Sequence, residues 1–261
     1  MSLRRENPAR GVKAIGFVLI AALAACTGDV DEQWFLDHDR IIAVRASSPG
    51  IVTGETSTLD ALVGFKGAPP AEMSPPLAMV VSPESLASTL SMTAGEWTVT
   101  APDEAALAAA RTELNLEAGA PVPLQVGVAF LATAFPARTS TDPVAALKTV
   151  WLGEHRDNPM ITGIDIDGVD GATLTDVVLD YTMDTPMRID ASVNDGDDVN
   201  WLTSCGTEHD FDLEHSYIRI EKDDPVEGDL AVVLRKPNGG VAWKTWTIHV
   251  DPATIPPAPA K

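Results

Sequence analysis

The chain has 261 residues and a formal net charge of −20 at pH 7, with 38 Asp and Glu against 18 Lys and Arg. So acidic a chain is not expected to bind nucleic acid or an anionic lipid surface through charge, because phosphate contacts need clustered Lys and Arg. The length allows one large or two small domains after any leader.

Residues 1–25 have the pattern of an export signal. Four basic residues and one acid occur before residue 14, and residues 14–25 carry no charge. A basic segment followed by a short apolar one is typical of a signal peptide. The apolar run is shorter than the ~20 residues of a comfortable membrane span.

The leader ends in Leu23-Ala24-Ala25-Cys26, which resembles the lipobox of bacterial lipoproteins. The resemblance implies that the leader is cut before Cys26 and that this cysteine carries lipid, which would attach the protein stably to a membrane. Removal of residues 1–25 would change the formal charge from −20 to −23. Thr27 in place of Asp points, by the same resemblance, to the outer rather than the inner membrane. The alternatives are an ordinary signal peptide with a chance cysteine and an uncleaved N-terminal helix.

Lipidation of Cys26 would leave Cys205 as a single thiol, so no internal disulfide is expected. We predict that Cys205 is a small buried hydrophobe; a free thiol or an intermolecular bridge is the alternative.

Residues 26–33 are predicted to be a tether and 34–152 a first domain. Alternating or β-branched apolar residues predict strands. These lie at 41–46, 59–65, 77–81, 96–99, 124–130 and 144–152. The prolines at 69–70 and 75–76 are expected to break the chain between strands. Thr100 with Asp103 three residues later predicts the start of a helix that covers the alanine-rich residues 105–113.

The polar residues 153–159, which end in Asn158-Pro159, predict a linker to a second domain at 160–251. Its strands are predicted at 160–164, 187–193, 199–203, 217–220, 230–234 and 241–250, with a hairpin turn at 236–240. Residues 252–261 form a Pro-rich tail that we expect to be extended.

About seven short strands in each half, separated by turns, predict an all-β fold with two tandem immunoglobulin-like β-sandwiches after a lipoprotein signal peptide, with one short helix inserted in the first. Trp201 is expected in the core of the second. The whole chain resembles myxobacterial-type surface lipoproteins with tandem immunoglobulin-like domains. The segments that carry this resemblance are 34–46, 54–63, 158–163 and 239–243. They are packing and turn positions, and the resemblance implies no catalytic motif.

Acidic residues 165–176 are a candidate calcium site. Asp165, Asp167 and Asp176 stand at positions 1, 3 and 12 of an EF-hand-like count, but Asp170 replaces the expected Gly and position 12 is not Glu. The alternative is a strand–turn–strand segment with two Asp-Gly turns. A second acidic turn at 194–198 is a further candidate for Ca²⁺.

Cys205, His209 and His215 could hold zinc or copper, or supply a Cys–His nucleophile pair, although the spacing fits no known template. The alternative is a polar loop with solvated histidines. No nucleophile elbow, phosphate loop or dinucleotide fingerprint occurs in the sequence. Trp243 and Trp246 are three residues apart on one strand, so they point to opposite faces. One should be in the core and the other a contact residue or part of inter-domain packing.

These features predict a lipid-anchored envelope protein that acts as a non-enzymatic binding or scaffolding module. Its expected partners are the membrane, through Cys26, and an envelope protein. The alternatives are a calcium-dependent adhesin or carbohydrate-binding module, and an envelope hydrolase with a deep pocket.

Overall fold

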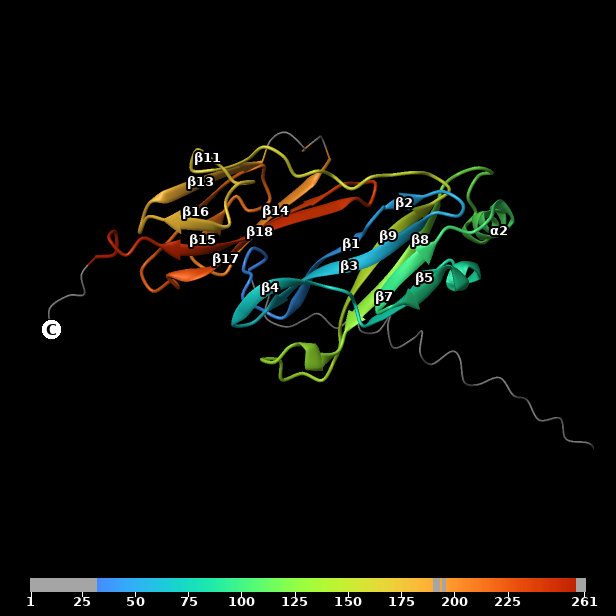
Figure 1. Ribbon diagram of the computed structural model, residues 1–261, viewed down its shortest axis with the longest axis horizontal. Helices are drawn as coiled ribbons and strands as arrows, with labels where there is room; N and C mark the ends of the chain where they lie inside the picture. The colour runs from blue at the N-terminus through green and yellow to red at the C-terminus, as the bar shows by residue number, and fades with distance from the viewer. Residues whose placement is uncertain (1–31, 190–192, 194–195, 257–261) are drawn as a thin grey trace, which may run out of the picture. The chain divides into compact units, whose positions relative to one another are not determined.

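The structure is a computed structural model that describes residues 32–189, 193 and 196–256 (Figure 1). The predicted signal peptide, Cys26, most of the tether and residues 257–261 of the tail lie outside the described residues. The described chain is all-β, with strands β1 to β18, one α-helix and two 3₁₀ helices. Among these helices, none has the length and apolar character needed to cross a membrane.

The first sandwich is built from strands β1 to β9. One sheet has the order β1-β3-β7-β6, with β4 also paired to β3. Its strands are β1 (Arg40–Ala46), β3 (Thr56–Phe65), β7 (Glu96–Thr100), β6 (Leu90–Thr93) and β4 (Ala68–Met73). The other sheet has the order β2-β9-β8-β5. Its strands are β2 (Gly50–Ile51), β9 (Val144–Leu152), β8 (Val122–Phe130) and β5 (Leu77–Ser82).

The two sheets of the first sandwich enclose one apolar core. Alternate residues of β3 and β8 point inward, such as Leu59 and Val63 from one sheet and Leu124 and Val126 from the other, and all four are at most 1 % exposed. This is the two-residue period of a strand with one face in a core. The alternation in the sequence therefore predicted the inward faces of these strands correctly.

The helix α2 (Glu104–Leu114) follows β7 and precedes β8 in the chain, and it packs on the core of the first sandwich. Its many alanines favour a helix, and Leu107 and Ala110 are buried on one face. The predicted helix is confirmed, but Thr100 is not its cap. Asp103 is the N-cap and its carboxylate accepts a hydrogen bond from the Ala106 N–H at 2.9 Å, whereas Thr100 is the last residue of β7. The short helices η1 (Glu84–Thr89) and η2 (Ala132–Ala134) were not predicted.

The second sandwich repeats this arrangement with β10 to β18. One sheet has the order β11-β10-β13-β16-β15 and the other β12-β18-β17-β14. The first comprises β11 (Val169–Asp170), β10 (Ile164–Ile166), β13 (Asp184–Ile189), β16 (His215–Arg219) and β15 (Thr207–His209). The second comprises β12 (Asp176–Leu179), β18 (Val241–Val250), β17 (Glu227–Arg235) and β14 (Asp198–Thr203).

Two stacked tryptophans lie at the centre of the second sandwich. Trp201 on β14 is fully buried, and its ring centroid is 6.5 Å from that of Trp246 on β18, with 18° between the ring planes. The Trp201 Nε1–H donates to the Leu213 carbonyl at 3.2 Å, so the buried indole is satisfied. The prediction that Trp201 lies in the core is confirmed.

The strand order assigns both sandwiches to the immunoglobulin-like class. In each, the first, second, fifth and fourth main strands (A, B, E, D) form one sheet, and the C, F and G strands form the other. A short strand after the first, β2 or β12, joins the second sheet by pairing parallel to its last strand. The same path therefore occurs twice along one chain. Both sandwiches belong to one compact unit, residues 31–261, and the domain boundaries at 152 and 160 stay a prediction.

Two local expectations are wrong. The predicted strand at 160–164 does not form; β10 starts only at Ile164, because Gly163 has φ 69° and interrupts the extended backbone. Conversely, Pro69 and Pro70 do not break the chain but lie within β4. Proline is tolerated there because β4 is an edge strand that pairs with β3 alone, so backbone N–H groups on its other side need no partner strand.

Candidate functional site

The junction between the two sandwiches is the candidate functional site, and a third apolar cluster forms it. The outer face of β1 and β3 supplies Ile42, Ala43 and Leu62, and the second sandwich supplies the facing residues. Those are Leu202, Ala231, Val233, Val241 and Trp243, with Leu36 from the segment before β1. The apolar contact makes the junction an internal packing surface rather than a flexible hinge.

The continuous apolar run of β17 follows from this junction. Leu230, Val232 and Leu234 point into the core of the second sandwich, whereas Ala231 and Val233 point into the junction. All five are fully buried. A strand covered on both faces has no polar face to alternate with, so its sequence is apolar throughout.

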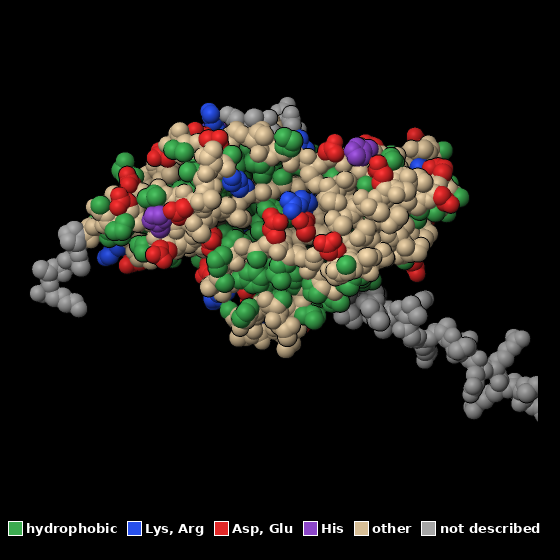
Figure 2. Space-filling view, in the orientation of Figure 1, with side chains coloured by type: hydrophobic (Ala, Val, Ile, Leu, Met, Phe, Trp, Pro, Cys, Tyr) green, Lys and Arg blue, Asp and Glu red, His purple; other side chains and the backbone are tan. Residues whose placement is uncertain are grey.

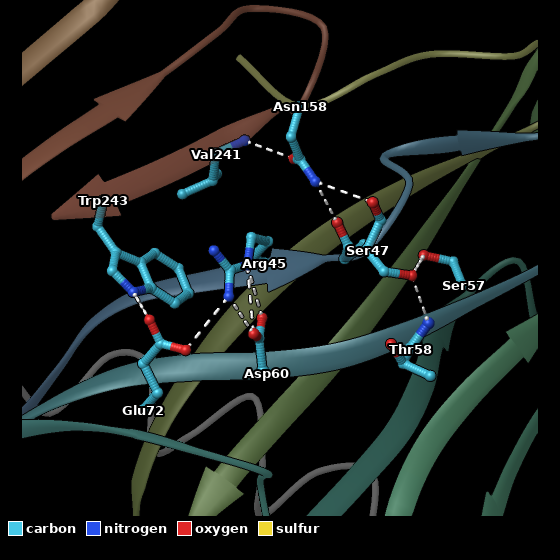
Figure 3. Close-up of polar contacts among 10 residues, drawn as sticks. Arg45, Ser47, Ser57, Thr58, Asp60, Glu72, Asn158, Val241 and Trp243 are labelled. Carbon is cyan, nitrogen blue, oxygen red and sulfur yellow. Dashed lines mark hydrogen bonds and ion pairs between the residues drawn. The ribbon is translucent and has the colours of Figure 1, made fainter. Parts of the chain in front are cut away.

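A polar cluster borders the apolar one and is drawn in Figure 3. The Arg45 guanidinium lies over the Trp243 ring, with Cζ 4.0 Å from the centroid, and donates to the Asp60 carboxylate at 2.5 Å. Glu72 on β4 accepts from the Trp243 Nε1–H at 2.6 Å and lies 3.5 Å from the Arg45 Nη2. Burial lowers the pKa of Arg45, but the hydrogen bond and charge of Asp60, together with Glu72, outweigh it and raise the pKa overall. Arg45 is therefore a permanent cation that joins three strands of two sandwiches.

Asn158 connects the linker to both sandwiches (Figure 3). Its Nδ2 donates to the carbonyls of Ala46 at 2.8 Å and Ser47 at 3.1 Å, and its Oδ1 accepts from the Val241 N–H at 2.9 Å. A carboxamide is the side-chain group that combines two N–H donors with an acceptor oxygen, as these three contacts require. The Asn-Pro pair was predicted to end a linker, and its Asn158 side chain hydrogen-bonds to both sandwiches.

The linker before Asn158 also packs tightly on the first sandwich. The backbone of Arg156 forms an isolated antiparallel β-bridge with that of Gly50. The approach is so close that a Cβ at Gly50 would clash with the Glu154 carbonyl oxygen, at 2.6 Å. The Arg156 guanidinium stacks 4.0 Å over the Trp151 ring and donates to the Asn238 carbonyl at 3.2 Å. Residues 153–158 therefore hold the two sandwiches together by contacts as well as by the covalent chain.

A second segment, residues 34–36 before β1, also crosses the junction. Phe35 forms a parallel bridge with Thr203 at the edge of β14. The Leu36 N–H donates to the Thr203 carbonyl at 2.8 Å, and the Thr203 N–H donates to the Trp34 carbonyl at 2.9 Å. Residues 34–36 thus bind the second sandwich before the chain enters the first. They cover an edge that would otherwise expose backbone donors and acceptors.

A buried cation, Lys148, and a half-buried one, Arg235, complete the junction. Lys148 on β9 is 5 % exposed and its Nζ donates to the Gly239 carbonyl at 2.5 Å. Arg235 on β17 donates to the Ile42 carbonyl at 2.8 Å and to the Asn200 side chain. Burial lowers the pKa of Lys148 to about 8, with nearby Arg235 and Arg45 contributing and Asp60 opposing. Burial also lowers the pKa of Arg235, against the charge of Asp198.

The candidate calcium residues take part in turns. Asp167 (φ 51°) and Gly168 (φ 79°) form the turn between β10 and β11, and the Asp165 carboxylate accepts from the Gly168 N–H at 2.9 Å. Asp170 accepts from the Ala172 N–H at 2.9 Å, and Asp176 lies 3.1 Å from His249. Within the described residues, no three His, Cys, Asp or Glu side chains are arranged to hold a metal ion. The strand–turn–strand alternative describes the segment, and the calcium hypothesis stays a prediction. Of the second acidic turn, Asn194 and Asp195 lie outside the described residues.

Cys205, His209 and His215 do not face a common point. The Cys205 thiol is buried and donates to the Pro225 carbonyl at 2.9 Å, and its burial raises the pKa to about 12. This confirms the prediction of a small buried residue. His209 stacks on Tyr217 with ring centroids 4.5 Å apart, and His215 is exposed at the start of β16. Glu208, which precedes His209 on β15, is 3 % exposed and accepts from the Ser216 hydroxyl, and burial raises its pKa to about 8.

Figure 2 shows acidic side chains spread over the face drawn, with fewer basic ones, most of them beside acids. One groove of about 580 Å³ is lined by the acids Asp37, Asp176, Glu227 and Asp229, together with His249. Burial raises the pKa of Asp229. The sequence predicts Asp176 as a site residue but not its neighbours in this groove, because they come from three distant segments of the chain.

No protein-family model and no curated protein matches the sequence. Among solved structures, the chain is similar to the tandem immunoglobulin repeats of Dlar, with 12% identity, coverage of 80% of this chain and 97% of that chain, and a TM-score of 0.29. It is also similar to the N-terminal Ig1-2 module of the Drosophila receptor protein tyrosine phosphatase DLAR, with 13% identity, coverage of 82% of this chain and 98% of that chain, and a TM-score of 0.27. Similarity to murine CEACAM1b has 8% identity, coverage of 80% of this chain and 100% of that chain, and a TM-score of 0.26. With TM-scores this low, the immunoglobulin-like class rests on the strand order instead.

Proposed function

We propose that the protein is a lipid-anchored cell-envelope protein that acts as a non-enzymatic binding and scaffolding module. The leader with Cys26 supports the anchor, and the junction supports the scaffolding role. Two filled immunoglobulin-like sandwiches present loops and strand edges, which suit protein–protein contact. Because the junction is packed and hydrogen-bonded, binding surfaces on the two sandwiches would be held at a fixed separation.

The single observation that carries the scaffolding role is the bridging of Asn158 across the apolar junction. A tether with independent modules would need only a solvated linker. Here the linker instead donates to one sandwich and accepts from the other. A partner that contacts both sandwiches would then bind without the entropy cost of ordering them.

The anchor is tested by growth with an alkyne-tagged fatty acid, followed by coupling of the purified protein to a fluorophore. The wild type and a Cys205→Ser variant should be labelled, and a Cys26→Ser variant should not. Cys205→Ser is the matched control because the thiol that it removes is buried. Equal labelling of the Cys26→Ser variant would exclude the proposed anchor.

The binding role is tested by crosslinking in cells and pull-down through a tag after residue 261, with and without a calcium chelator in the wash. Recovery of a defined envelope protein despite chelation supports the scaffold. Loss of the partner on chelation would favour the calcium-dependent adhesin instead. Failure to recover any defined partner in either wash would contradict both.

A further inference from the structure

A cavity of about 290 Å³ opens at the junction, beside the polar cluster of Arg45. Its walls come from β1, from β9 and from the β17–β18 turn, so both sandwiches form it. The volume is near the lower end of small-molecule pockets, which span roughly 300–1,000 Å³. A small organic ligand would fit inside it.

The charge of this cavity is opposite to that of the chain. Its lining residues include Lys148, Arg235 and Lys236 and, within the described part of the chain, no Asp or Glu. The whole protein has a net charge of −20, and its larger groove is lined by four acids. A cavity that concentrates cations in so acidic a protein is complementary to an anion.

Of the three cations that line the cavity, Lys148 is the one that forms no salt bridge with the described residues, although the charge of Asp60 acts on it from a greater distance. Lys236 and Arg235 each have an Asp carboxylate oxygen at 3.9 Å, Asp197 and Asp198 respectively. Lys148 is 5 % exposed, and its hydrogen-bond partner among the described residues is a neutral carbonyl, that of Gly239. A buried ammonium normally has a carboxylate partner, because the desolvated charge is costly without one. Its three donors leave two for a ligand.

The remaining lining favours a short apolar chain next to the charge. Ile41, Leu147 and Val241 line the cavity, and Leu147 is 48% exposed although it is a large aliphatic residue. Beside the cavity, a Cβ at Gly239 would lie 3.4 Å from Trp151 Nε1, a buried donor without a hydrogen-bond partner in the described chain. The site thus combines unused buried donors with aliphatic walls.

We propose that the junction cavity binds a small aliphatic carboxylate, with its carboxylate group on the Lys148 ammonium and its alkyl chain against Ile41 and Leu147. Such a ligand would supply the negative charge that the cavity lacks. Since the walls come from both sandwiches, the bound ligand would stabilise the junction. The pKa of Lys148, about 8, leaves the ammonium mostly protonated at pH 7 and so able to pair with the carboxylate.

The test is calorimetric titration of the purified full chain with sodium butanoate at pH 7, with butanol and inorganic phosphate as comparison probes. We expect saturable one-to-one binding of butanoate, none of butanol, and at least tenfold weaker binding to a Lys148→Met variant. A Lys66→Met variant is the matched control, because Lys66 is exposed and lies outside the cavity. It should bind butanoate as the wild type does.

A measurement on the wild type keeps the test valid if Lys148→Met fails to fold. In ¹⁵N NMR of the lysine Nζ groups, butanoate should raise the pKa of Lys148 and leave the chemical shift of the Lys66 Nζ unchanged. Butanoate binding that is equal in the wild type and a folded Lys148→Met variant, or a Lys148 pKa that butanoate does not move, would overturn the proposal. Binding of phosphate without butanoate would overturn the carboxylate assignment.

Discussion

Replacement of Asn158 should loosen the junction by a calculable amount. The Asn158→Ala variant removes three hydrogen bonds, to the Ala46 and Ser47 carbonyls and from the Val241 N–H. A hydrogen bond contributes about 0.5–1.5 kcal/mol net, so the free energy of unfolding should fall by roughly 3 kcal/mol. In a chain of this size that corresponds to a decrease in Tm of roughly 6–12 °C.

The Asn158→Asp variant tests whether the donors of Asn158 matter. A carboxylate could still accept from the Val241 N–H, but it would place a negative oxygen against two carbonyl oxygens. We therefore expect Asn158→Asp to be less stable than Asn158→Ala at pH 7, by about 1 kcal/mol or more. Below about pH 4 the carboxyl group protonates and can donate again, so the gap should narrow.

Urea unfolding followed by tryptophan fluorescence and circular dichroism provides the assay. The wild type should unfold in one transition with coincident probes, because the apolar junction couples the sandwiches. If Asn158→Asp at pH 7 is as stable as Asn158→Ala, the bridging role assigned to the Asn158 amide is wrong. A loss below 0.5 kcal/mol for both variants would show that the junction depends on the apolar cluster alone.

Three further predictions concern buried groups. The folded pKa of Glu208, about 8, is raised above its ordinary value of 4.5, so its contribution to stability is full below pH 4.5 and is lost as pH rises to 8. Glu208→Gln should remove about 3–4 kcal/mol of this pH dependence between denaturation curves at pH 5 and pH 8. An unchanged dependence would argue against this role, and the exposed Glu214→Gln variant is the control. The pKa of Lys148 is lowered from 10.5 to about 8. The free energy of unfolding should therefore rise by up to about 3 kcal/mol as the pH increases from 8 to 10.5. A Lys148→Met variant measured at pH 7 and 10 should lack that rise. Trp243→Ala should cost about 3–5 kcal/mol by chemical denaturation, as for other large core truncations, whereas a loss under 1 kcal/mol would mean that the junction is not packed.

Strands with one covered face were predictable from the sequence, and strands in special positions were not. Alternation located β3 and β8 because a single core buries every second residue of such a strand. The prolines of β4 hid a strand that the edge of the sheet tolerates. A run of apolar residues from Met160 predicted a strand that the positive φ of Gly163 prevents.

The junction was only partly predictable, because it joins segments that are far apart in the sequence. Inter-domain packing was one of the alternatives for the two tryptophans, and Trp243 does lie in the junction cluster, while Trp246 lies in the core. The run Leu230–Leu234 carried the missing signal, since five apolar residues in a strand indicate two covered faces. No sequence pattern indicated the contacts of Arg45 and Asn158, because a single Arg or Asn in a junction cannot be distinguished by sequence from one in a solvated loop.

The attachment of residues 34–36 to β14 has a consequence for the order of assembly. Phe35 pairs with Thr203, so about two thirds of the chain separates the two halves of this contact. During synthesis, the first sandwich can complete its core before its outer face is covered, and Ile42 and Leu62 then remain in water until β17 and β18 arrive. Closure of contacts this distant in sequence is slow, and an uncovered apolar face promotes aggregation in the interval. We therefore expect the docking of the two sandwiches to be the last step of folding, and we expect a chaperone that shields apolar surface to act mainly at that step.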